Sequence, residues 1–199
     1  MKAKWILLGS FLAVAALAGG VSASEGQLSN EGTAHVFVEV NPTIAIGVPQ
    51  PHVNLGSVGT GIVTGTITFR IDANTERVKM HVQATNLCKG DQPRPLDGLP
   101  LYEIPVTGQG ALVEPESAGP LAGGSNLLDW VSQAVEDTGT GWKWSTSKCQ
   151  VFDSSQGGHF SQGVDVTVEW DQSNAELPLG EYSGFVKLVA EIVMPGMPS

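Results

Sequence analysis

Basic residues are scarce in this sequence. It contains ten Lys and Arg against twenty Asp and Glu, and its formal net charge is −10. Nucleic acids and anionic membranes bind proteins through clustered Lys and Arg side chains. The shortage of basic residues therefore argues against both as partners of this protein.

Known catalytic motifs are also missing. The chain has no G-x-S-x-G elbow, no H-E-x-x-H helix motif and no Walker-type glycine loop. Its four histidines are scattered along the chain, without partners at catalytic or metal-ligand spacing: His35, His52, His81 and His159. We expect a protein that is not an enzyme and that carries no metal or other cofactor.

Only the N-terminus has a long hydrophobic run. Lys2 and Lys4 precede apolar residues from position 5 to about 18, and residues 21–23 are Val-Ser-Ala. This pattern predicts a signal peptide over residues 1–23. The run is shorter than the roughly 20 residues needed to span a bilayer, so an uncleaved anchor is the weaker alternative. We expect a secreted or cell-surface protein with no membrane insertion after cleavage. Losing Lys2 and Lys4 would change the net charge from −10 to −12.

The chain has only two cysteines, Cys88 and Cys149. An even number in an exported chain favours a disulfide. This bond would close a loop of about sixty residues and stabilise the fold by about 4 kcal/mol. A two-cysteine metal site is the alternative, although neither cysteine has a nearby His or second Cys at ligand spacing.

Helical patterns are rare, whereas alternation of apolar and polar residues recurs. This period of two predicts strands at residues 34–40, 61–71, 77–85, 101–107, 141–152, 163–170 and 181–193. Turn residues at 72–76 predict that the second and third of these pair as a hairpin. One segment, residues 125–135, has the apolar spacing of a short helix.

These patterns predict one domain and its fold class. We expect a flexible polar leader at residues 24–32 and a single domain at 33–199. The fold class is all-β: an antiparallel Ig-like or jelly-roll β-sandwich with at most one short helix.

Trp142 and Trp144 are the sharper candidates for a ligand-binding site. They lie two residues apart on a predicted strand, so their side chains share one face. If exposed, their rings could stack on sugars, as in a secreted carbohydrate-binding module. Alternatively, both line the core of the sandwich.

Two segments carry a resemblance to a known family. Residues 53–74, VNLGSVGTGIVTGTITFRIDAN, and residues 177–193, LPLGEYSGFVKLVAEIV, resemble the early segment and the terminal strand of bacterial fimbrial, or pilin-like, subunits. The first is also similar to spore-coat-U-like secreted domains. The resemblance implies a structural subunit of an extracellular fibre, pilus or coat.

In such subunits an N-terminal segment of one copy is added as a strand to the next copy. The resemblance therefore implies self-association into a filament, with a periplasmic chaperone as a further partner that such subunits can need. It makes Val36, Val38 and Val40 the candidate donor-strand face. The alternative is that residues 34–40 form the first strand of the domain itself.

Overall fold

The computed structural model describes residues 37–116, 121–122, 126–154 and 156–193. The predicted signal peptide, the leader and Val36 lie outside these residues. Contacts divide the chain after Glu39, and the strands that the structure describes belong to the second unit, residues 40–199. In the described part of this unit every strand pairing is antiparallel and there is no helix, which confirms an all-β sandwich. No helix among the described residues is long and apolar enough to cross a membrane.

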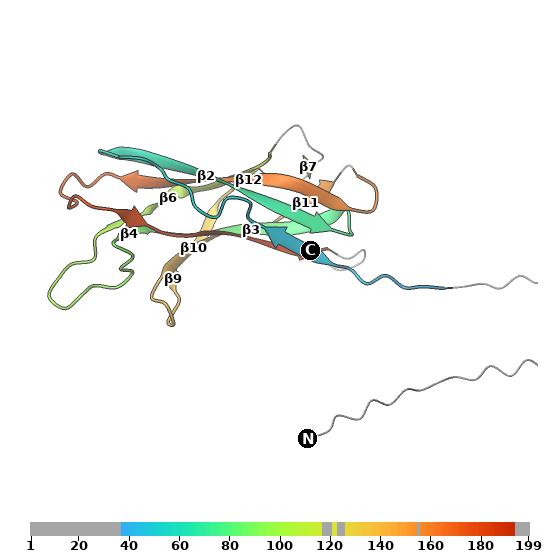
Figure 1. Ribbon diagram of the computed structural model, residues 1–199, viewed down its shortest axis with the longest axis horizontal. Helices are drawn as coiled ribbons and strands as arrows, with labels where there is room; N and C mark the ends of the chain where they lie inside the picture. The colour runs from blue at the N-terminus through green and yellow to red at the C-terminus, as the bar shows by residue number, and fades with distance from the viewer. Residues whose placement is uncertain (1–36, 117–120, 123–125, 155, 194–199) are drawn as a thin grey trace, which may run out of the picture. The chain divides into compact units, whose positions relative to one another are not determined.

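The first sheet has five strands, and its centre is a long pair. β2 (Gly61–Ala73) and β12 (Phe160–Gln172) pair over their full lengths, from Gly61 opposite Gln172 to Ala73 opposite Phe160. They run side by side along the sandwich in Figure 1. The remaining strands are β1 (Ile44–Gly47) beside β2, then β6 (Val106–Pro115) and β8 (Leu127–Leu128) beyond β12.

The second sheet is organised around β3 (Arg77–Thr85). On one edge, β10 (Lys143–Ser147) and β11 (Gln150–Ser154) pair with successive halves of β3. On the other edge lies β14 (Val186–Ile192). The sheet continues through β9 (Trp130–Glu136) and β7 (Leu121–Ala122), and a small third sheet contains β13 (Tyr182–Ser183), β4 (Leu87–Lys89) and β5 (Glu103–Ile104).

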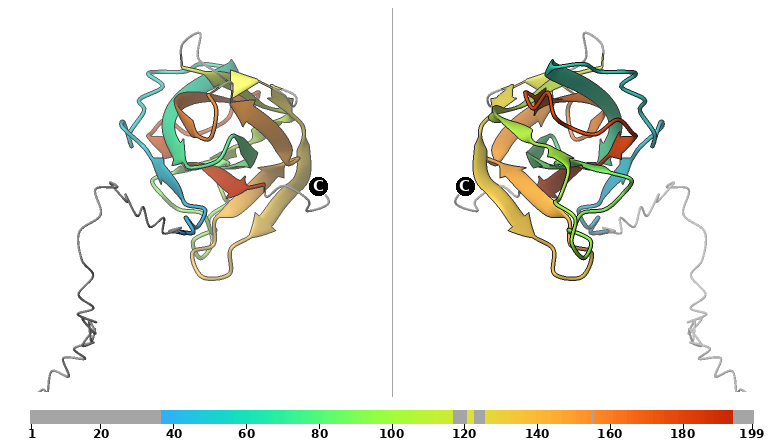
Figure 2. Two further views of the ribbon diagram at one scale, coloured as in Figure 1. Left: turned by 90° about the vertical axis from the view of Figure 1, so that its right-hand side faces the viewer. Right: turned by 90° about the vertical axis from the view of Figure 1, so that its left-hand side faces the viewer.

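The core lies between the two larger sheets. Alternate residues of β2, β3 and β12 are buried, including Ile71, Met80 and Val166, which have no exposed surface. Figure 2, which looks along the sandwich, shows the strands surrounding the space that these side chains fill. Trp170 belongs to this core, and its indole Nε1 donates a buried hydrogen bond of 2.9 Å to the carbonyl of Thr85.

The hairpin predicted for residues 61–71 and 77–85 is wrong. β2 and β3 follow each other closely, but they lie in different sheets. Both have one fully apolar face, and stacking these faces across the core buries both. Asn74 stabilises the connection between β2 and β3. Its side chain accepts a hydrogen bond from the Thr43 amide at 2.6 Å and donates one to the Asn41 carbonyl at 3.0 Å.

The helix predicted for residues 125–135 is also wrong, because the described part of this segment forms β8 and β9. β8 pairs with β6, and β9 pairs with β10, so each extends an edge of a sheet. Leu128 is fully buried while its neighbour Leu127 is exposed, which is strand alternation. Pairing with strands distant in sequence therefore makes this segment form strands instead of a helix.

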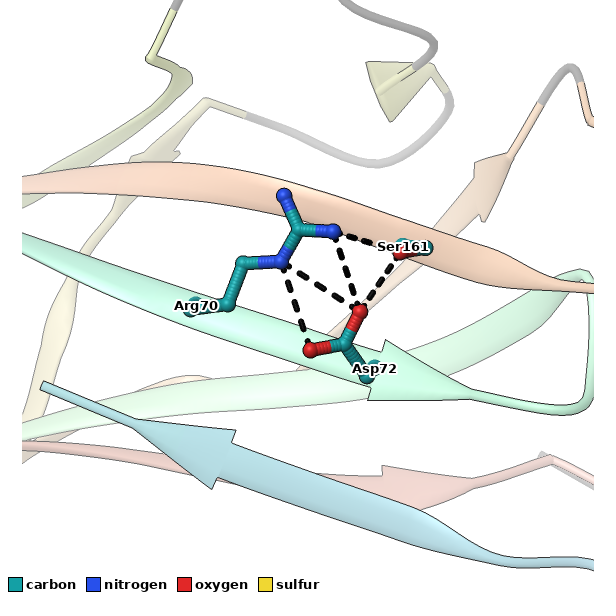
Figure 3. A network of polar contacts seen from close by, with 3 residues as sticks. All are labelled: Arg70, Asp72 and Ser161. Atoms are coloured by element: carbon teal, nitrogen blue, oxygen red, sulfur yellow. Dashed lines mark hydrogen bonds and ion pairs between the residues drawn. The ribbon is translucent and has the colours of Figure 1, made fainter.

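The outward face of the first sheet is polar. Arg70 donates hydrogen bonds to Asp72 (3.1 Å) and to Ser161 (2.6 Å), and Ser161 donates to Asp72 (2.5 Å), as Figure 3 shows. The Arg70 and Ser161 hydrogen bonds hold the pKa of Asp72 below its usual value. Further along, the hydroxyls of Thr66 and Thr167 are 2.8 Å apart. These polar groups pair with one another, and Ile62 on β2 is an exposed apolar side chain of the same face.

Candidate functional site

β14 has one open edge. Phe185 accepts a hydrogen bond from the Thr85 amide, and Val193 donates one to the Arg77 carbonyl, so the odd-numbered residues face β3. In an antiparallel pair the intervening residues direct their N–H and C=O groups to the opposite side. In β14 the residues whose N–H and C=O groups point away from β3 are Val186, Leu188, Ala190 and Ile192. No strand in the described ranges pairs with that side. An unpaired edge of this kind can accept another strand.

A groove lies beside the start of β14. Its volume is about 870 Å³, and it lies between β2 and the segment 177–186 that leads into β14. Val63 and Ile67 of β2 line one side, and Trp170, Leu87 and Ile104 also line it. A separate stretch, residues 48–58, contributes most of the remaining lining. The start of β14, at Val186, therefore lies beside a depression lined by both apolar and polar residues.

The segment before β1 is extended and exposed. Val38 and Val40 are 87% and 74% exposed, and Phe37 is also exposed. Residues 37–40 belong to no strand, so the strand predicted for residues 34–40 is not present in its described part. The first strand of the sandwich is β1, which begins at Ile44. Of the donor-strand candidates, Val38 and Val40 are thus not part of the sandwich core, and Val36 lies outside the described residues.

Trp142 and Trp144 both contact Phe185. The Trp142 ring meets it edge-on at 5.0 Å between centroids, and the Trp144 ring lies at 6.4 Å. Trp142 is only 9% exposed, and the Lys187 ammonium lies 3.8 Å from the Trp144 ring centroid. Little ring surface therefore remains free for a sugar. Carbohydrate stacking stays a prediction, and a tryptophan fluorescence titration with polysaccharides tests it.

Cys88 and Cys149 are free, so the disulfide expected between them is not formed. Cys149 lies between β10 and β11, with its Sγ 3.6 Å from His81 Nδ1. From His81 to the end of β3 at Thr85 is about 13 Å of extended chain. Cys88 lies beyond that end, in the third sheet. A disulfide needs Cα atoms within about 7 Å, so the two strands hold these thiols too far apart.

The two thiols differ in environment. Burial, with a smaller contribution from Glu103, raises the pKa of Cys88 to about 11. Cys149 is exposed, and burial lowers the pKa of its neighbour His81. In the part of the chain that the structure describes, no three His, Cys, Asp or Glu side chains gather as metal ligands.

The three histidines that the structure describes do not form a common site. His52 lies in residues 48–58 beside the groove, His81 is on β3, and His159 Nδ1 lies 3.2 Å from the Gly157 carbonyl oxygen in a loop. His35 is outside the described residues. The structure thus assembles a strand edge and a groove, which are features of a binding surface.

Sequence reasoning did not single out Leu55 or Phe185. Leu55 is the one Leu in a stretch rich in Pro and Gly, and it packs against the core. Phe185 follows a glycine just before the closing strand and joins the two tryptophans. An isolated large apolar residue in a polar or Gly-rich segment was the available signal for both.

Comparison with known protein families, characterised proteins and solved structures found no significant match.

Proposed function

We propose that this protein is a structural subunit of an extracellular fibre, pilus or coat, and that copies assemble by β-strand addition. One observation carries the proposal. The chain has an exposed apolar segment with strand-like alternation, around Val38 and Val40, and it also has a sheet edge on β14 that no described strand pairs with. The exposed segment of one copy could pair as a strand with the β14 edge of a neighbouring copy.

The dimensions of the two partners agree. The donor segment, residues 34–40, has seven residues, as does β14. In the added strand, Val36, Val38 and Val40 would turn towards the groove, and the intervening residues would face away. Main-chain bonds would form with the outward amides and carbonyls of β14. Because the contact is head-to-tail and need not close, it would propagate a filament.

The first test places a charge in the donor segment. Val38→Asp is expected to abolish filaments while leaving the monomer folded, because a carboxylate buried without a partner costs several kcal/mol. Val131→Asp is the matched control, since Val131 is also exposed (57%) but lies on β9. Ser29→Ala in the leader is a second control. The measurements are negative-stain electron microscopy, size-exclusion chromatography and thermal unfolding of each variant.

Three outcomes would contradict the proposal. If the unaltered protein stays a monomer at high concentration, it is not a fibre subunit of this kind. If Val38→Asp unfolds the monomer, residues 34–40 belong to the subunit's own core. If Val38→Asp is folded and still forms filaments, the donor assignment is wrong.

A further inference from the structure

Residues 48–58, here called the cover segment, take the place of a strand without pairing as one. β1 pairs with β2 up to Gly47 opposite Arg70, and the ladder then stops. Pro49 and Pro51 have no N–H to continue it. Among the hydrogen bonds of the described residues, the one that involves this segment is internal, from the Gly56 amide to Asn54 Oδ1 at 2.8 Å. No ladder therefore holds the cover segment to either sheet.

Leu55 is the anchor of the cover segment. It is partly buried and packs against the core, and a methyl group on Gly65 would come within 2.9 Å of its Cδ2 and 3.0 Å of the Trp170 ring. The glycine in the middle of β2 thus makes room for Leu55. The valines of the segment, Val48, Val53 and Val58, are all well exposed. One side chain provides most of the apolar attachment.

The cover segment lies on the groove described above. It forms much of the groove lining, opposite the segment that leads into β14. A groove of about 870 Å³ remains open beside it, so the segment fills the space only in part. Apolar surface that is poorly covered is prone to association.

We infer that the cover segment is a displaceable placeholder, which shields the groove in the free subunit and is released when the donor strand of a second copy enters. The inference rests on the proposed function. A segment with one partly buried anchor and no ladder opens at low free-energy cost compared with a core strand. A valine side chain of the incoming strand would then occupy the position that Leu55 has between Gly65 and Trp170.

The test compares assembly rates of full-length mature chains. Leu55→Ala removes the anchor, and assembly followed by light scattering should be faster, on the order of fivefold for about 1 kcal/mol of weakened attachment. Val131→Ala is the matched control, because Val131 is also an exposed valine (57%) but lies on β9 and does not line the groove. It should assemble at the rate of the unaltered chain. Thermal unfolding checks that both variants are folded.

A second measurement does not depend on a variant. Brief digestion with subtilisin, followed by mass spectrometry, should cut residues 48–58 more readily in filaments than in monomers, because assembly releases them. Equal or stronger protection in filaments would overturn the inference.

The outcomes separate the two proposals. If Leu55→Ala assembles at the unaltered rate or more slowly, while Val38→Asp still abolishes filaments, the placeholder is wrong and strand addition stands. If the unaltered chain forms no filaments, or Val38→Asp forms them, strand addition fails and the placeholder fails with it.

Discussion

At the scale of single residues, the two cysteines show how position decides chemistry. Cys88 is buried, and its pKa of about 11 keeps it as a neutral thiol at physiological pH. Cys149 is exposed beside His81. The thiolate is the reactive form, so a buried thiol whose pKa is raised, such as Cys88, reacts slowly.

We expect one fast thiol in the native protein. With an aromatic disulfide reagent at pH 8, Cys149 should react rapidly and Cys88 only after unfolding, and Cys149→Ser should remove the fast phase. Because the folded-state pKa of Cys88 is raised, its contribution to stability is complete below the unfolded value of about 8.5 and is lost as pH rises through about 11. Unfolded, unreduced protein with no reactive thiol would instead indicate a disulfide.

At the scale of elements, the pairing of β6 with β8 depends on one glycine. Gly110 has φ +108°, and a methyl group there would collide with the Leu128 carbonyl oxygen. The next residue, Ala111, is opposite Leu128 in the ladder. Only a residue without a side chain lets β8 approach β6 this closely.

Gly110→Ala should destabilise the sandwich by about 2–4 kcal/mol, from backbone strain and the collision with β8. Gly108→Ala, on the same strand, should change stability by no more than about 0.5 kcal/mol, because no atom lies near the added methyl group. Chemical denaturation of the two variants measures both values. Equal stabilities would mean that β8 is not held against β6.

At the scale of the whole molecule, charge opposes self-association. Four of the eight basic residues after position 23 already form ion pairs within the sandwich: Arg70, Arg77, Arg94 and Lys148. The acidic excess is therefore left largely uncompensated. Copies of this acidic chain should repel each other at long range.

Salt should therefore accelerate the assembly that we propose. Raising the ionic strength from about 0.01 M to 0.15 M shortens the screening length from about 30 Å to 8 Å, which weakens repulsion between subunits. We expect the light-scattering rate of filament growth to increase, and thermal unfolding at each salt concentration controls for stability. A rate that falls with salt would indicate complementary charged faces instead.

Local sequence patterns were sufficient to predict much of the fold. The strand predicted at residues 163–170 is the centre of β12, and the closing strand places Leu188 in the core, as its alternation indicates. Period-two alternation is a property of neighbouring residues, and it survives in whichever sheet the strand joins. The apolar alternation around Val38 was also visible in the sequence. The sequence did not show whether the sandwich buries this segment.

The sequence by itself determined that the domain is all-β and which segments form most of its strands. Only the tertiary structure decided that β2 and β3 face each other across the core, that residues after 125 form edge strands, and that Cys88 and Cys149 are apart. It also placed the cover segment on the groove beside β14. These features depend on contacts between residues far apart in the chain, whose free energy outweighs the local preferences that a sequence pattern records.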